Sequence, residues 1–284
     1  MPLETGALEG FNLKARVISA FTLAFFLLAI VVFNSSFPLA LNIAIAVVSF
    51  LGVYEILTAL GFLKNYILMV PSLAFAAVFP FLETSLLRET GYFLYTAILF
   101  AGLIVYHSRV TFREVGVVYS MSLMIPTALE TLVELRALGG PHGMFYVLIG
   151  IFSAWVSDMG GFFAGHLFGR HPLCPNVSPK KTVEGAAGSF VLNTAAMLLA
   201  GVLFQHFYAN SVKVSFPTLI VVGVGGTVLS ILGDLSFSLI KRSCHIKDFS
   251  EIIPGHGGIL DRFDSVIFEA PFVFLLVQVS PIVK

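Results

Sequence analysis

The chain has 284 residues, of which 57% are hydrophobic and only 11% are charged. Soluble proteins carry about 25% charged residues, so a chain this apolar cannot form one water-soluble domain, and most of it must lie in lipid. The formal net charge is zero, which gives no sign of a nucleic-acid partner.

Long apolar stretches recur along the whole chain. Spanning the hydrocarbon core takes about 20 apolar residues, and lipid offers no hydrogen bonds to bare backbone, so the stretches must be helices; their length excludes a closed barrel. The sequence predicts an all-α polytopic integral membrane protein. Its about nine helices are expected over residues 16–34, 37–61, 66–83, 91–106, 114–134, 144–168, 185–208, 216–240 and 259–280.

The Lys and Arg residues are distributed unequally between the two sides of the membrane. With nine helices, twelve of them fall on one side and four on the other. By the positive-inside rule, the N-terminus and the loops 169–184 and 241–258 are expected to be cytoplasmic. Cys174 and Cys244 fall on the same side and are expected to be reduced thiols.

We expect two parts, residues 1–136 with helices one to five and residues 144–284 with helices six to nine. The polar residues that point to chemistry concentrate in the second part. Residues 1–13 fit either an interfacial arm or an expression leader, and the sequence leaves both readings open.

Several carboxylates lie within or at the edge of the apolar stretches, where an unpaired charge costs at least ~2.5 kcal/mol. They are Asp158, Asp234, Asp261, Asp264, Glu55 and Glu269. Asp261 and Asp264 share a helix face, and Asp234 lies about 10 Å inside the end of its helix. Oxygen-only ligands favour a hard cation, with Mg²⁺ as the first choice.

Each carboxylate also has a plainer interpretation. Backbone amides or Arg262 would satisfy Asp261 and Asp264 at the start of a helix. Asp158 fits either a group supporting the metal site or an interhelical hydrogen bond. For Glu55 and Glu269 we favour a structural role, with each satisfied by a neighbouring helix.

A glycine-rich turn, Pro254-Gly255-His256-Gly257-Gly258, comes directly before the last apolar stretch. Glycine backbone can approach a phosphate closely and point its N–H groups at it. The helix that follows would favour an anion at its N-terminus. His256 fits a phosphate contact or an acid, and equally a hydrogen bond that shapes the loop.

A second polar cluster lies in the loop 169–184. Its Ser178, Lys180, Lys181 and Thr182 carry the donors that a triphosphate needs. The alternative is an ordinary positive loop that touches lipid headgroups. Gly161, Gly165 and Gly169, at four-residue intervals just before it, indicate close helix packing.

The two clusters together resemble the signature of the CTP-dependent phosphatidate cytidylyltransferases, the CDP-diacylglycerol synthases. The first match comprises Ser238, Lys241-Arg242, Lys247-Asp248, Pro254 to Gly258 and Asp261-Arg262-x-Asp264, and the second resembles the SP-x-KT-x-x-G element at Ser178 to Gly185. The resemblance extends from Asp158 to Glu269. The N-terminal half matches only in hydropathy and in Tyr54-Glu55.

The resemblance implies the reaction CTP + phosphatidate → CDP-diacylglycerol + pyrophosphate, in phospholipid biosynthesis. It implies Mg²⁺, with a second cation left open, often a homodimer, and a site that faces the cytoplasm in a bacterial inner membrane. The expected catalytic residues are Asp234, Asp261, Asp264, Lys241, Arg242, Lys247 and Asp248, with the metal held by Asp234, Asp261 and Asp264. The expected substrate-binding residues are Ser178, Lys180, Lys181, Thr182, Gly255, His256, Gly257, Gly258 and Arg262.

Two other functions remain open at this point. A CTP-dependent lipid-alcohol kinase would use the same nucleotide but transfer its γ-phosphate and release CDP. A cation-coupled transporter would also keep carboxylates inside a helix bundle, although it does not explain the glycine-rich turn.

Overall fold

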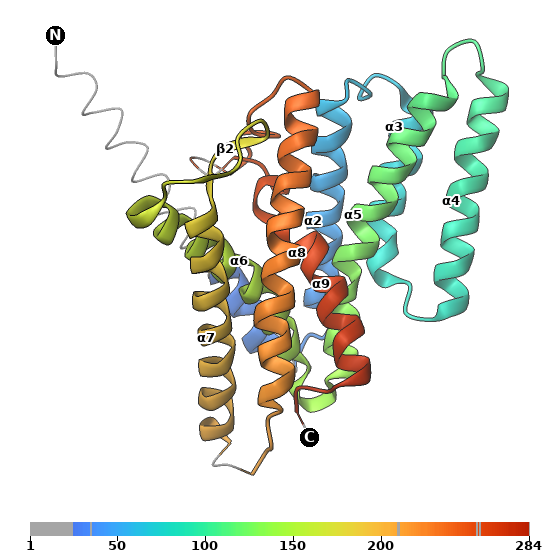
Figure 1. Ribbon diagram of the computed structural model, residues 1–284. Coiled ribbons are helices and arrows are strands. Elements are labelled where there is room, and N and C mark those ends of the chain that lie inside the picture. Colours follow the sequence, from blue (N-terminus) through green and yellow to red (C-terminus); the bar gives the residue numbers. More distant parts are fainter. Residues whose placement is uncertain (1–24, 35, 209–210, 254, 256, 284) are drawn as a thin grey trace, which may run out of the picture. The chain divides into compact units, whose positions relative to one another are not determined.

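The structure is a computed structural model that describes residues 25–34, 36–208, 211–253, 255 and 257–283. The described residues are mainly helical, and residues 25–33 precede the first labelled helix (Figure 1). The helices are α2 Leu39–Ala59, α3 Tyr66–Val78, η1 Phe79–Phe81, α4 Ser85–Val105, α5 Phe112–Leu138, η2 Gly140–His142, α6 Gly143–Phe168, α7 Val183–Phe207, α8 Phe216–Ser243 and α9 Leu260–Val279. The strands β1 Pro172–Cys174 and β2 Ser178–Thr182 form one antiparallel hairpin.

The expected fold class is confirmed, since the chain is an all-α integral membrane protein apart from this hairpin. The helices α2 to α9 fall where the last eight apolar stretches were predicted. Among the described residues, five helices are long and apolar enough to cross a membrane, and α3 with η1 is a shorter apolar segment. The count of nine spans and the side of the N-terminus stay predictions, because part of the first stretch lies outside the described residues.

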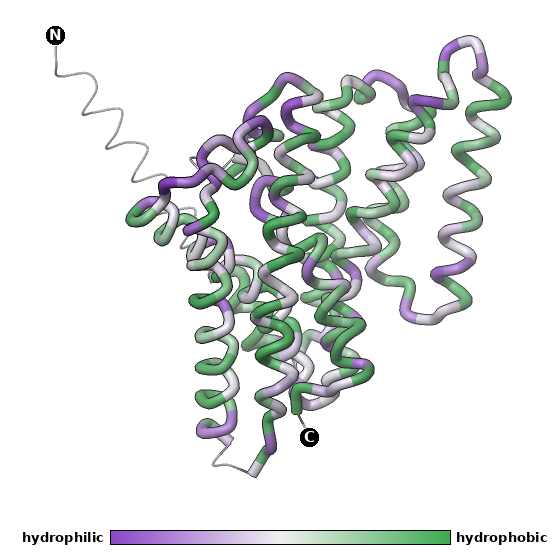
Figure 2. The backbone as a smooth tube through the Cα atoms, viewed as in Figure 1, coloured by the Kyte–Doolittle hydropathy of each residue, from purple (hydrophilic) through white to green (hydrophobic). Residues whose placement is uncertain are grey.

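The helix surfaces show why lipid is the solvent. Helix α7 is coloured mostly as hydrophobic in Figure 2, yet much of it is exposed, with Val191 at 72% and Phe207 at 83%. Exposing this apolar surface to water would cost free energy, whereas exposing it to lipid does not. The buried face of α7 consists of small and polar residues together with one methionine: Gly185, Ser189, Asn193, Met197 and Gly201.

Packing divides the chain into two compact units. The first comprises the described residues up to Thr127 together with Cys244–Arg262, and the second comprises Ala128–Ser243 together with the residues from Phe263 onward. The functional division expected from the sequence, at residues 136–144, stays a prediction.

Glycines allow α6, α7 and α8 of the second unit to approach closely. A side-chain carbon on Gly188 would lie 2.1 Å from Cβ of Ala164, and one on Gly223 would lie 2.6 Å from Cα of Thr194. A carbon on Gly161 of α6 would lie 2.9 Å from Oγ of Ser189 on α7. The prediction that the glycines before loop 169–184 serve close helix packing is therefore confirmed at Gly161, in the manner typical of membrane helices.

In the first unit, the carboxylate of Glu55 on α2 holds the start of α9. The backbone N–H groups of Ile259 and Leu260 donate to its Oε1 and Oε2, at 2.9 and 2.8 Å. The hydroxyl of Ser250 donates to Oε1 at 2.5 Å. Glu55 is 1% exposed, and a negative charge at a helix N-terminus is favourable. The predicted structural role of Glu55 is confirmed.

Glu55→Ala is expected to destabilise the protein by about 2–5 kcal/mol, because it leaves two buried amides without an acceptor. Gly258→Ala should act in the same direction, since the added carbon would lie 2.6 Å from both carboxylate oxygens of Glu55. Thermal unfolding of purified protein in detergent measures both effects. Glu89→Gln, which removes an exposed carboxylate from α4, is the control. An unchanged melting temperature for Glu55→Ala would refute the anchoring role.

Candidate functional site

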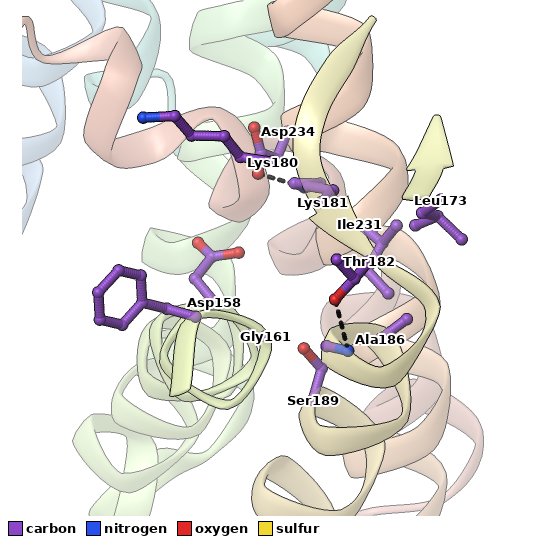
Figure 3. Close-up of a pocket in the computed structure, with 12 residues that line it drawn as sticks. Asp158, Gly161, Leu173, Lys180, Lys181, Thr182, Ala186, Ser189, Ile231 and Asp234 are labelled. Atoms are coloured by element: carbon purple, nitrogen blue, oxygen red, sulfur yellow. Dashed lines mark hydrogen bonds and ion pairs between the residues drawn. The ribbon is translucent and has the colours of Figure 1, made fainter. Parts of the chain in front are cut away.

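The second unit contains a cavity of about 220 Å³ between the hairpin and three helices. Figure 3 shows Lys180, Lys181 and Thr182 from the hairpin and the start of α7 on one side, with Asp158 of α6 and Asp234 of α8 facing them. The cavity therefore collects basic, hydroxyl and carboxylate groups that are far apart in the sequence.

The hairpin places the two lysines, and α7 fixes the hairpin. The backbone N–H groups of Arg170 and His171 donate to Oε2 of Glu184 at 3.1 and 3.2 Å, and Nδ1 of His171 lies 2.5 Å from Oε1. Oγ1 of Thr182 accepts from the N–H of Gly185 at 3.1 Å and so caps α7. These contacts close the base of the hairpin, next to Lys180 and Lys181.

Lys181 forms an ion pair with Asp234 across the cavity (Figure 3). Their side chains are 24% and 27% exposed, so the pair is only partly screened by solvent. Ser238, one turn further along α8, donates to the other oxygen of Asp234 at 3.3 Å. Asp234 thus contacts a residue of each sequence cluster, Lys181 of the loop 169–184 and Ser238 of the first match.

Asp158 and Asp264 complete a group of three carboxylates in the second unit. The hydroxyls of Ser265 and Ser230 donate to Asp158 at 3.1 and 3.2 Å. Asp264 is 6% exposed and accepts from the N–H of Ser265 at 2.8 Å. Asp158, Asp234 and Asp264 are close enough to repel one another electrostatically, and Lys181 and Lys241 are the cations that offset them.

A hard divalent cation suits the chemistry of these donors, because all are carboxylate oxygens and the three negative charges exceed the nearby positive charge. The side-chain positions themselves do not form a ligand shell: over the described part of the chain, no three His, Cys, Asp or Glu side chains are arranged to hold one ion. Lys181 occupies one oxygen of Asp234. The metal assignment to Asp234, Asp261 and Asp264 stays a prediction.

The glycine-rich turn lies in the first unit. Gly255 and Gly257 have φ of 77° and 83°, a left-handed conformation that only glycine adopts at little cost. The N–H of Ile253 donates to the carbonyl of Gly257 at 2.9 Å and closes the turn. Pro254 and His256 lie outside the described residues, so the predicted roles of His256 are not addressed.

Asp261 supports this turn. Its Oδ2 accepts from the N–H groups of Phe249 and Gly258, at 2.9 and 3.0 Å. The structure therefore shows the alternative that the sequence left open, in which backbone amides donate to Asp261. The N–H of Gly258 donates to Asp261, and the N–H groups of Ile259 and Leu260 at the start of α9 donate to Glu55. The anion predicted at the N-terminus of this helix is therefore a carboxylate of the protein itself.

The remaining predicted residues are divided between the units. In the second unit, Lys241 and Arg242 lie in the last turn of α8, and Ser178 begins β2. In the first unit, Lys247 and Asp248 lie on an exposed loop and Arg262 is exposed in the first turn of α9. A joint role of the two sets in one site stays a prediction.

Sequence reasoning missed two serines that organise the site. Ser230 and Ser265 both donate to Asp158, and Ser265 also donates to the carbonyl of Ser230. Ser230 precedes Asp234 by one helical turn, a spacing that would have indicated a shared face. No comparable signal pointed to Ser265.

Comparison with known proteins gives one consistent result. The cytidylyltransferase family matches residues 14–280 of the chain. A phosphatidate cytidylyltransferase of Bacillus subtilis (strain 168) is 37% identical over 166 residues, which cover 58% of this chain and 59% of that protein. A protein of the same name from Haemophilus influenzae is 40% identical over 133 residues, covering 46% and 45%. Another from Staphylococcus saprophyticus is 31% identical over 233 residues, covering 82% of each.

The matched part spans about half the length of the first two relatives and most of the third. The family match is broader, since it takes in nearly all of the chain, including both polar clusters. The resemblance seen in the sequence is thereby confirmed, and the chain belongs to the cytidylyltransferase family.

Proposed function

We propose that the protein is a phosphatidate cytidylyltransferase, which converts CTP and phosphatidate to CDP-diacylglycerol and pyrophosphate. The observation that carries the proposal is the cavity of the second unit, where Lys180 and Lys181 face Asp158 and Asp234. Basic side chains attract a triphosphate, and carboxylates attract the hard cation that accompanies it. Three relatives of the same family carry this activity in their names.

The chemistry asks the protein mainly for positioning and charge stabilisation. An oxygen of the ionised phosphatidate headgroup attacks the α-phosphorus of CTP, and the bond to the β-phosphate breaks to release pyrophosphate. The nucleophile is already an anion, so neither a protein nucleophile nor a strong general base is required. In this reading, Lys180 and Lys181 screen the phosphates of CTP, and Thr182 supplies a further donor.

Asp234 and Asp264, with Asp158 beside them, are the residues of the second unit that would hold Mg²⁺. Such a cation would neutralise phosphoryl oxygens and the departing pyrophosphate. Ser230 and Ser265 fix the carboxylate of Asp158 through their hydroxyls. Asp261 is the third predicted ligand, and its hydrogen bonds to the glycine-rich turn give it a second role in positioning.

We place the cavity on the cytoplasmic side of a bacterial inner membrane, because the positively charged loops belong on that side. CTP reaches the cavity from the cytoplasm, and phosphatidate enters from the bilayer. The exposed apolar surface of α7 beside the cavity suits a substrate whose acyl chains remain in lipid.

The first test follows the label of α-³²P-CTP with purified protein, phosphatidate in mixed micelles and Mg²⁺. Label should enter the lipid phase with stoichiometric pyrophosphate. Asp234→Asn and Asp264→Asn should each lower turnover by about 10²-fold or more, because a charge that stabilises the transferring group is lost. Glu89→Gln, which removes an exposed carboxylate from α4, should leave turnover unchanged.

Two outcomes would count against the proposal. Label that stays in water as CDP would indicate the lipid-alcohol kinase reaction instead. Near-normal turnover in both aspartate variants would remove these residues from the reaction.

The second test concerns Lys181. Lys181→Ala should raise the CTP concentration needed for half-maximal rate about tenfold or more, since each tenfold change corresponds to about 1.4 kcal/mol of binding. The phosphatidate requirement should change little. Lys181→Arg keeps the charge and should recover most of the loss. If phosphatidate dependence changes more than CTP dependence, the loop binds the lipid headgroup.

The third test concerns sidedness. Cys174 on β1 and Cys244 after α8 are free thiols, each partly accessible. A membrane-impermeant maleimide should label them in inside-out vesicles and not in right-side-out vesicles. The Cys174→Ser and Cys244→Ser variants assign the label to each site. Labelling from the outside would reverse the proposed orientation.

A further inference from the structure

Two loops of the first unit carry exposed cations. They are residues 60–65, between α2 and α3, and residues 106–111, between α4 and α5. Lys64 lies on the first loop, Arg109 on the second and Arg113 in the first turn of α5, and all three are exposed. None of their side chains forms an ion pair or a hydrogen bond with the residues that the structure describes. Their charge is therefore available to a ligand.

The two loops lie next to each other, because the helix ends that carry them are in contact. A side-chain carbon on Gly102, in the last turn of α4, would lie 2.7 Å from Cγ2 of Ile67, in the first turn of α3. Both loops lie at the same end of the unit (Figure 1). Lys64 precedes α3 directly and Arg109 follows α4 directly, so their positive charges act on the same region.

The sequence around these cations supplies almost no negative charge. Residues 56–82 and 90–113 contain no Asp or Glu. The acidic residue that comes next, Glu114, accepts at its Oε2 from the N–H and the hydroxyl of Thr111, at 2.7 and 2.9 Å. The N–H of Glu114 donates back to Oγ1 of Thr111 at 3.3 Å. Glu114 therefore belongs to the N-terminal cap of α5 and does not pair with an arginine.

The loop that carries Arg109 is fixed by its own contacts. Val110 is 1% exposed and anchors the loop to the unit. The N–H groups of Arg109 and Val110 both donate to the carbonyl of Tyr106, at 2.8 and 3.0 Å. A loop that is already ordered loses little backbone entropy when its side chains bind a ligand.

Exposed aromatic side chains flank the cations. Tyr66 is 70% exposed, Tyr106 is 44% exposed and Phe112 is 68% exposed. Tyrosines at the ends of apolar helices are typical of the membrane–water interface, where lipid headgroups lie. This position favours a lipid headgroup over a partner in solution.

We propose that Lys64, Arg109 and Arg113 form a binding surface for anionic phospholipid headgroups. Each cation close to an anionic bilayer surface strengthens binding roughly fivefold, and an arginine can donate two parallel N–H groups to one phosphate. The surface belongs to the first unit, whereas the cavity of Lys181 and Asp234 belongs to the second. The proposal therefore does not rest on the proposed reaction.

The test is thermal unfolding of the purified full chain in uncharged detergent, without CTP, phosphatidate or Mg²⁺. Phosphatidylglycerol, which is anionic, is compared with zwitterionic phosphatidylcholine of the same acyl chains. Phosphatidylglycerol should raise the melting temperature more, because it binds the folded protein through its charge. The difference should shrink in 1 M NaCl, where the screening length is only about 3 Å.

Substitution of the arginines measures their share. Arg109→Gln should raise the phosphatidylglycerol concentration for half-maximal stabilisation roughly fivefold, and Arg109→Gln with Arg113→Gln should raise it roughly 25-fold. The corresponding double lysine variant keeps both charges and should retain most of the binding. All these positions are exposed, so the variants should fold normally without lipid.

Three controls locate the effect. Lys213→Gln removes an exposed cation from the loop between α7 and α8 and should leave the lipid dependence unchanged. Lys181→Ala removes a lysine of the cavity and should also retain the dependence. Inorganic phosphate at the same concentration should not replace the lipid, because it lacks the acyl chains that hold the headgroup at the interface.

Three results would overturn the proposal. One is equal stabilisation of the unaltered protein by the two lipids, and another is an unchanged phosphatidylglycerol dependence in the double glutamine variant. The third is loss of the dependence in Lys181→Ala alone, which would assign the anionic lipid to the cavity.

Discussion

The structure depends on one constraint: a carboxylate placed among lipid-bound helices must be compensated from within the protein or by a bound ligand. Lipid supplies neither counter-charge nor hydrogen bond. The kind of compensation differs from residue to residue, and it indicates the role. Asp234 is matched by a lysine from the hairpin, Asp158 by two serine hydroxyls, and Glu55 by backbone amides. A carboxylate paired with one partly exposed lysine side chain can exchange that partner for a ligand, whereas one held by backbone amides is part of the framework.

The helices could be predicted from the sequence because lipid makes hydropathy a strong signal. The stretches 37–61 and 216–240 were found as α2 Leu39–Ala59 and α8 Phe216–Ser243. The hairpin was not predicted. Its strands are short, and their pairing depends on contacts such as those of Glu184 with Arg170 and His171, which leave no periodic pattern in the sequence.

The site was predictable as a set of residue types, but the partner of each residue was not. Asp261 and Asp264 are three residues apart on α9, and the spacing suggested a shared ligand. In the structure, Oδ2 of Asp261 accepts two amides of the glycine-rich turn, while Asp264 is buried near Asp158 and Asp234. Glu55 was assigned a structural role without a known partner, and that partner lies about 200 residues away in the chain. Only the folded chain reveals such pairings, because helix periodicity specifies a face and not what packs against it.

The two ends of the hairpin between α6 and α7 are constrained differently. Glu184 and Thr182 secure the end that carries Lys180 and Lys181, whereas the tip, residues 175–177, turns through the hydrogen bond from the N–H of Val177 to the carbonyl of Cys174. The tip is thus free to change in length and composition over evolution without displacing the lysines. Related proteins could gain or lose segments there, and so acquire new surface contacts while retaining the same cavity.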